Sequence, residues 1–235
     1  MTNQNIFYET FFPNAFREFS RARSEKVRFV HYTSAEAAFK IINSEKAWMR
    51  KSSTMNDLSE INHGFSIVEK ALVMHLDLPS ALNEISAGLY DEVLSSYRDC
   101  KGPLLDETYV FSLSEHNLSE DILGRLSMWR AYGRGNGVAL ILNNTPFVGE
   151  DDTLGVFTSP VIYGDLNRAN IELSTIVANI KSNISHLRSI DKKLLKNGIL
   201  MALCFGATSL KHPGSRVSIM TEEYYNTAYK EINKK

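Results

Sequence analysis

Residues 27–43 read VRFVHYTSAEAAFKIIN, and this stretch decides the fold. Val27–Tyr32 is rich in β-branched and aromatic residues, which is typical of a strand. Thr33 or Ser34 then offers a hydroxyl that can cap a helix, and Ala35–Asn43 carries an apolar face. The order strand, cap, helix predicts a junction at which polar side chains point into a crevice.

Length and composition describe an ordinary globular chain. Its 235 residues allow one domain or two, and 43% apolar residues are enough to build a core. No repeat or low-complexity segment divides the sequence. We therefore expect a single domain over residues 1–235.

Charge and cysteine content limit the function classes. Lys and Arg total 26 and Asp and Glu total 27, a formal net charge of −1 that disfavours a dedicated nucleic-acid binder but allows a small local patch. Cys100 and Cys204 match no metal or redox spacing, and two buried thiols are favoured over a disulfide. No secretory signal or apolar run long enough for a bilayer is found, so we expect a soluble, cytoplasmic protein without membrane contact.

Hydrophobic spacing predicts interspersed helices and strands. The helices expected are Asn5–Ser20, Asn56–His75, Ser80–Ser96, Ser119–Tyr132 and Asn170–Asn197, the last with a pause near Ser189–Asp191. The strands expected are Trp48–Met49, Thr108–Leu113, a centrally buried Val138–Leu142, Gly155–Tyr163 and Ile199–Phe205. Without regular βαβ spacing, this order favours an α+β fold with a mixed or antiparallel central sheet and helical insertions.

Three groups of residues could line a ligand site near the crevice. His31 and Tyr32 offer a hydrogen-bonding ring and a stacking face for a planar ligand, although a half-buried histidine and a core tyrosine would look the same. Ser112 alternates with apolar neighbours, but no Gly-x-Ser-x-Gly elbow marks a serine nucleophile. Trp129 and Tyr132 end a predicted helix, where core anchoring is the alternative.

Two further polar groups have a common structural explanation. Asp57 and Glu60, after Asn56, have the spacing of a helix capping box as well as of a carboxylate pair. A metal site there would need more ligands at familiar intervals, so none is predicted. Lys211 and His212 beside a Pro-Gly turn fit an anion site or an ordinary surface loop.

The order of these pieces resembles a bacterial family catalogued as domain of unknown function 2971. The matching elements are His31-Tyr-Thr-Ser34, Ile41-Ile42, Trp48, Asn56-Asp57-x-x-Glu60, Phe111-Ser112, Met128-Trp129-x-x-Tyr132, Gly137-Val-Ala-Leu140 and Lys211-His212. They extend over about Phe29 to Gly214. The resemblance implies an N-terminal helical segment at residues 1–26, a family core at 27–214 and a diverged or truncated tail at 215–235.

The first block also looks like the opening motif of ADP-ribosyltransferases of the His-Tyr-Glu class and of DarT-like toxins. This resemblance implies that His31 anchors NAD, that Tyr32 and Thr33 follow it in the pocket, and that Ser112 occupies the middle motif. Trp129 and Tyr132 would complete the cofactor-binding cleft, with Asn56, Asp57, Glu60, Lys211 and His212 as further cleft candidates. A toxin or phage-defence effector with a nucleic-acid or protein acceptor is the function that this likeness implies.

The expected late glutamate is where the sequence departs from the family. Cleaving the nicotinamide bond builds oxocarbenium character that a carboxylate stabilises. The family's Glu-x-Glu-Trp-Arg-like run is absent after Lys211-His212, and Glu222 and Glu223 are the nearest catalytic candidates. We hypothesise a diverged, truncated or frameshifted ending that lacks the last core strand and the catalytic Glu. The alternatives are therefore an inactive binding or regulatory module and, with less support, a metal-dependent hydrolase using Asp57, Glu60 and His63.

Overall fold

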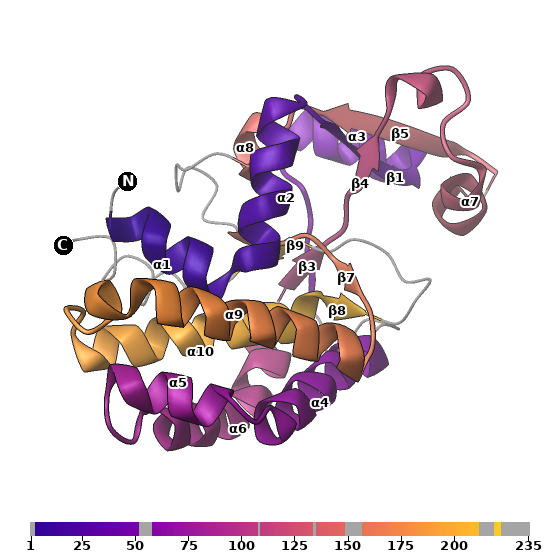
Figure 1. The fold of residues 1–235 in the computed structure, drawn as a ribbon. Coiled ribbons are helices and arrows are strands. Elements are labelled where there is room, and N and C mark those ends of the chain that lie inside the picture. Colours follow the sequence, from indigo (N-terminus) through magenta and orange to yellow (C-terminus); the bar gives the residue numbers. More distant parts are fainter. Residues whose placement is uncertain are drawn as a thin grey trace.

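A layer of packed helices, which we call the helical body, holds the main hydrophobic core (Figure 1). The computed structural model describes residues 3–51, 58–107, 109–133, 135–148, 157–211 and 219–221. The helical body consists of α1 (Asn3–Phe11), α4 (Leu58–Met74), α5 (Leu78–Ile85), α6 (Leu89–Glu107), α9 (Leu166–Leu187) and α10 (Lys192–Ser209). Apolar residues recur at helical spacing along these elements, so their faces meet and exclude water.

A second region, which we call the strand lobe, surrounds the stretch 27–43. Its antiparallel sheet has the order β4 (Ser114–His116), β1 (Arg28–Ser34), β5 (Gly137–Leu142). The flanking elements are α2 (Pro13–Ser24), α3 (Ala35–Ser44), η2 (Leu118–Glu120), α7 (Leu126–Met128), the π-helix η3 (Trp129–Gly133) and α8 (Thr145–Val148). The buried apolar cluster of the lobe is small and contains Val30, Tyr32 and Met128.

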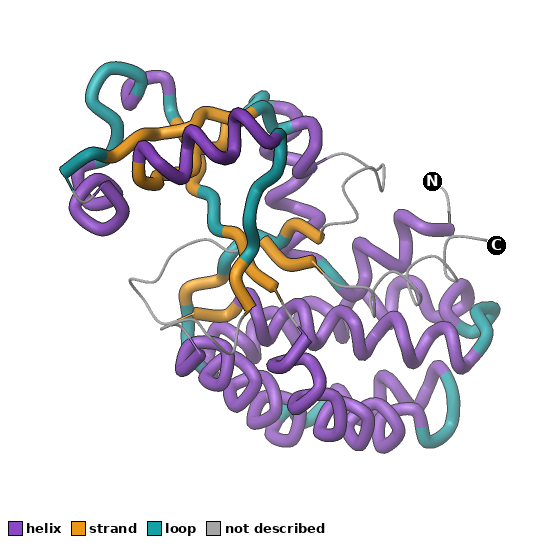
Figure 2. Tube along the Cα trace, turned by 180° about the vertical axis from the view of Figure 1, so that it is seen from behind, coloured by secondary structure: helices purple, strands orange, loops and turns teal. Residues whose placement is uncertain are grey.

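Short strands lie between the helical body and the strand lobe (Figure 2). A four-stranded antiparallel sheet has the order β2 (Arg50–Lys51), β3 (Tyr109–Phe111), β9 (Ile219–Thr221), β6 (Phe157–Thr158). A parallel pair joins β7 (Ile162–Tyr163) to β8 (Leu210–Lys211). The α+β class is confirmed, but the described strands form three small sheets instead of one central sheet, and the helices carry most of the core.

The central prediction for residues 27–43 is confirmed. β1 is followed at once by α3, and the Ser34 hydroxyl accepts a hydrogen bond from the Ala37 N–H at 3.2 Å. Ser34, not Thr33, is therefore the cap. The pause between α9 and α10 is also confirmed, and Asp191 caps the second of these helices.

Three predicted elements are wrong in type or environment. Ile199–Phe205 is part of α10, not a strand, because an all-apolar run suits a fully buried helix equally well. Ser119–Tyr132 is not one helix but a 3₁₀ turn, a short loop, the one-turn helix α7 and the π-helix η3, and most of its predicted apolar face is exposed, with Ile122 91% exposed. Val138–Leu142 is a strand, but it lies at the sheet edge and is half-buried, not centrally buried.

Two predicted helices are each divided. Asn5–Ser20 falls into α1 and α2, which separate just before Pro13, a residue that lacks an N–H and so begins a new helix. Ser80–Ser96 falls into α5 and α6, with Gly88 between them at φ +74°. β9 was also missed, because residues 215–235 were expected to supply no strand. In the described part of the chain, no helix combines the length and hydropathy needed to cross a bilayer.

Candidate functional site

His31 occupies a defined position at the junction of the two regions. Its Nδ1 lies 3.0 Å from the Ser112 carbonyl oxygen, which can only accept, so Nδ1 carries the proton and donates it. The imidazole stacks on Phe111 with 4.3 Å between ring centroids. Burial lowers the pKa of His31, opposed by the Ser112 hydrogen bond, so the neutral ring presents Nε2 as an acceptor.

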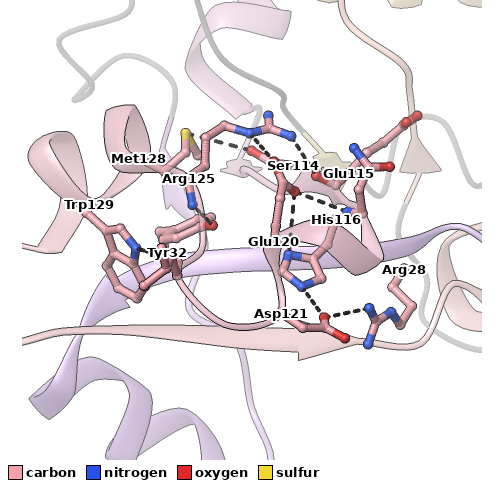
Figure 3. A network of polar contacts seen from close by, with 12 residues as sticks. Arg28, Tyr32, Ser114, Glu115, His116, Glu120, Asp121, Arg125, Met128 and Trp129 are labelled. Atoms are coloured by element: carbon pink, nitrogen blue, oxygen red, sulfur yellow. Dashed lines mark hydrogen bonds and ion pairs between the residues drawn. The ribbon is translucent and has the colours of Figure 1, made fainter.

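Tyr32 lies on the other face of β1, because successive strand residues point to opposite sides. Its side chain is buried, and its hydroxyl accepts a hydrogen bond from the Arg125 N–H at 2.8 Å. The Trp129 ring packs edge-on against it at 4.8 Å, and Trp129 Nε1 donates to the Leu123 carbonyl at 2.7 Å. Tyr32 and Trp129 thus pack together in the lobe core (Figure 3).

The structure therefore divides the predicted ligand-contacting residues. His31 and Ser112 come together on one face of β1, with Thr33 farther along the same face. Tyr32 and Trp129 come together on the opposite face. Tyr132 lies in η3 with its side chain 36% exposed. These residues therefore do not line one shared pocket.

A polar cleft of about 740 Å³ adjoins the strand lobe. It opens between α2, the β4 edge of the lobe sheet and the segment 158–163, and its polar lining includes Arg17, Glu18, Ser114, Glu115, Asn117, Arg125, Ser127 and Arg168. Phe29, two residues before His31 on the same strand face, and Leu113, next to Ser112, also line it. Two residues along a strand span about 7 Å, so His31 lies about that far along β1 from the lining residue Phe29 and is not itself part of the lining.

The lining of the polar cleft carries more positive than negative charge, because it contains three arginine guanidinium groups and two glutamate carboxylates. Arg17 bonds Asn14 at 2.7 Å, Arg125 bonds Glu120 at 2.8 Å, and Arg168 pairs with Glu172 at 2.7 Å. Among the described residues, each of these guanidinium groups uses one or two of its N–H groups, and arginine has five. Donors therefore remain for an anionic ligand.

A network of charged and polar side chains (Figure 3) adjoins the cleft through Arg125, which lines it. Buried His116 donates from Nε2 to Asp121 at 2.8 Å, and Arg28 bonds the same carboxylate at 2.7 Å. These two hydrogen bonds, from His116 first, lower the pKa of Asp121. Glu120 bonds Arg125 and caps η2 together with Asn117. We call this set the lobe network; it fixes residues 117–125 in place.

Several predicted site residues lie outside the described part of the chain. Asn56, Asp57, His212, Glu222 and Glu223 are among them, and for Glu60 and Lys211 only the backbone is described. The expected opening of a helix after Asp57 agrees with α4, which begins at Leu58. Within the described residues, no group of three or more His, Cys, Asp or Glu side chains is arranged to hold a metal ion.

The register of β9 fixes how its three residues lie along β3. Ile219 pairs with Phe111, whereas Thr221 pairs with Tyr109. Phe111 is the end of β3 that contacts His31, and Tyr109 is the other end. The last described residue before the two glutamates therefore lies at the end of β3 away from His31.

The cleft residues were missed in the sequence because they come from segments far apart. Arg17, Arg125 and Arg168 lie on α2, a loop and α9, and each has ordinary surface neighbours in the sequence. No family model, no curated protein and no solved structure matches the chain. Function is therefore inferred from the geometry of the cleft and from the order of the motifs.

Proposed function

We propose that this chain is a cytoplasmic ADP-ribosyltransferase-like protein that takes NAD as its substrate and serves as a toxin or phage-defence effector. The resemblance of the ordered motifs to domain of unknown function 2971 and to the His-Tyr-Glu class supports this proposal. The observation that supports it best is the environment of His31: a ring whose Nδ1 donates to Ser112 and whose Nε2 is left as an acceptor, on the strand face that carries Phe29 of the arginine-lined cleft.

The chemistry of NAD suits this arrangement. The imidazole Nε2 can accept a hydrogen bond from a ribose hydroxyl, and Phe111 supplies the aromatic ring next to His31. The diphosphate carries two negative charges, which Arg17, Arg125 and Arg168 can bind through their remaining N–H groups. In this proposal the small antiparallel sheets around β1 and β3 form the ADP-ribosyltransferase-like core.

Bond cleavage would need a carboxylate beside the ribose. As the nicotinamide leaves, positive charge develops on the ribose, and a fixed carboxylate stabilises it. Glu222 or Glu223 would have this role in an active transferase. A nucleic acid or a protein would then accept the ADP-ribosyl group.

A binding or regulatory module of the same fold is the second candidate. The absence of the family's Glu-x-Glu-Trp-Arg-like run after Lys211-His212 favours it. Such a module would bind NAD through the same cleft without breaking the nicotinamide bond. NAD would then stabilise the fold by mass action and would not be consumed.

Two assays test the proposal. One measures the release of nicotinamide from NAD, and the other measures the transfer of labelled ADP-ribose onto protein or nucleic acid. We expect His31→Ala to lower both by roughly 10- to 100-fold, the equivalent of one or two hydrogen bonds to the ligand. His75→Gln is a matched control, because His75 lies at the end of α4 and bonds Ser174, outside the cleft. Normal transfer by His31→Ala would overturn the proposal.

A second readout separates the two candidates. If NAD raises the melting temperature of the wild type but not of His31→Ala, and no nicotinamide is released, the chain is a binding module. Turnover that is lost in Glu222→Gln or Glu223→Gln while NAD still stabilises the protein identifies an active transferase. Neither stabilisation nor turnover would contradict both candidates.

A further inference from the structure

Two thiols from distant parts of the chain meet inside the helical body. Cys100 lies on α6 and Cys204 on α10, 104 positions apart in sequence, and their sulfur atoms are 3.1 Å apart. No disulfide joins them in the structure. A disulfide bond is about 2.05 Å long, so a shift of about 1 Å would join them.

The two thiols differ in access to solvent. Cys204 is 2% exposed within the core, whereas Cys100 is only half-buried. A hydrogen bond from Cys204 lowers the pKa of Cys100, against the opposing effect of burial. Because the thiolate is the reactive form, Cys100 is the sulfur that an oxidant reaches first.

We propose that Cys100 and Cys204 are a redox modification site, at which a peroxide converts the pair into a reversible intramolecular disulfide. The Cys100 thiolate attacks one peroxide oxygen, the O–O bond breaks, and a sulfenic acid and one water form once the leaving hydroxide is protonated. The Cys204 sulfur then attacks the sulfenic sulfur, the S–S bond forms, and a second water leaves. The two thiols lose two electrons and two protons, and the peroxide is reduced to two waters.

Crosslinking would join the two helices that lead into the small sheets. α6 leads into β3, whose last residue Phe111 stacks on His31, and α10 leads into β8. The bond would close a loop of 104 positions, which restricts the unfolded chain strongly. The oxidised protein is therefore expected to resist denaturant better than the reduced protein. This inference stands on the thiol geometry and is independent of the proposed use of NAD.

The test uses the full chain treated with hydrogen peroxide and then denatured for thiol counting. We expect the number of titratable thiols to fall from two to none, the intact mass to fall by about 2 Da, and dithiothreitol to reverse both changes. The denaturation midpoint should be higher for the oxidised form. Two thiols still titratable after peroxide, or disulfides found only between molecules, would overturn the proposal.

Single substitutions assign the order of the steps. In Cys204→Ala, Cys100 has no partner, so a sulfenic acid should persist and react with dimedone. In Cys100→Ser, the buried Cys204 should stay unmodified under the same treatment. Dimedone labelling of Cys204 in preference to Cys100 would contradict the assigned roles, and the thiol count on the wild type tests the disulfide even if a variant folds poorly.

Discussion

In the helical body, Ile180 and Leu187 of α9 and Leu195 of α10 are at most 1% exposed and belong to one large apolar cluster. In the strand lobe, the buried cluster contains Val30, Tyr32 and Met128, and most of the surrounding contacts are hydrogen bonds and ion pairs. Burial of apolar area therefore stabilises the helical body, whereas directed polar contacts hold the strand lobe. The proposed ligand site belongs to the less apolar region, where local opening needs less free energy.

Removing a buried side chain from the helical body should have the largest effect. Ile180→Ala should lower the free energy of unfolding by about 2–5 kcal/mol, because it leaves a cavity at a position that is 0% exposed. Ile171→Ala on the same helix is the matched control, since Ile171 is 57% exposed and should change stability by at most about 0.5 kcal/mol. Denaturant titration of both variants measures the difference. Equal losses would show that α9 does not bury the face described.

Removing one hydroxyl from the strand lobe should have a smaller and local effect. Tyr32→Phe keeps the ring against Trp129 but leaves the Arg125 N–H without its partner, at a cost of about 1 kcal/mol. Hydrogen exchange should become faster within residues 28–34, with little change in α9. Tyr109→Phe, at a tyrosine that is 44% exposed, serves as the control. Faster exchange throughout α9 would contradict the separation of the two regions.

As the pH is lowered, the strand lobe should open at a higher pH than the helical body. We expect this to be the smallest of the three effects on stability. The His116 and Arg28 hydrogen bonds keep the pKa of Asp121 below its unfolded value of about 3.9. Its stabilising contribution is therefore present above that pH and is lost as the pH falls through the lower, folded value. Hydrogen exchange at falling pH should show the lobe opening first, and Asp121→Asn should reduce this pH dependence. If Asp121→Asn shows the same pH profile as the wild type, the lobe network does not cause the opening of the lobe at low pH.

Local sequence rules predicted the parts of the fold that depend on neighbouring residues. The alternation of β1, the Ser34 cap and the α9–α10 break follow from side-chain spacing and capping chemistry over a few residues. Ile199–Phe205 could not be assigned in this way, because an uninterrupted apolar run fits a buried strand and a buried helix equally.

The site was predicted only in part for a similar reason. His31 was singled out from its strand-to-helix junction, and its contact with Ser112 joins two predicted motifs. The division between His31 and Tyr32 follows from strand alternation, but which face meets the cleft depends on the packing of α2 and β4. The helix predicted over this region is wrong for residues 118–126, because polar contacts hold this segment whereas Leu118, Ile122 and Leu123 are exposed.

Hydrogen exchange of the full chain with and without NAD tests the central claim most directly, since it reports where the ligand binds. We expect NAD-dependent protection in residues 14–22, 28–34 and 109–117, which line or adjoin the polar cleft, and no such protection in His31→Ala. The helical body at residues 78–85 should exchange at the same rate in both conditions. Protection confined to those helices, or none in the wild type at saturating NAD, would contradict it.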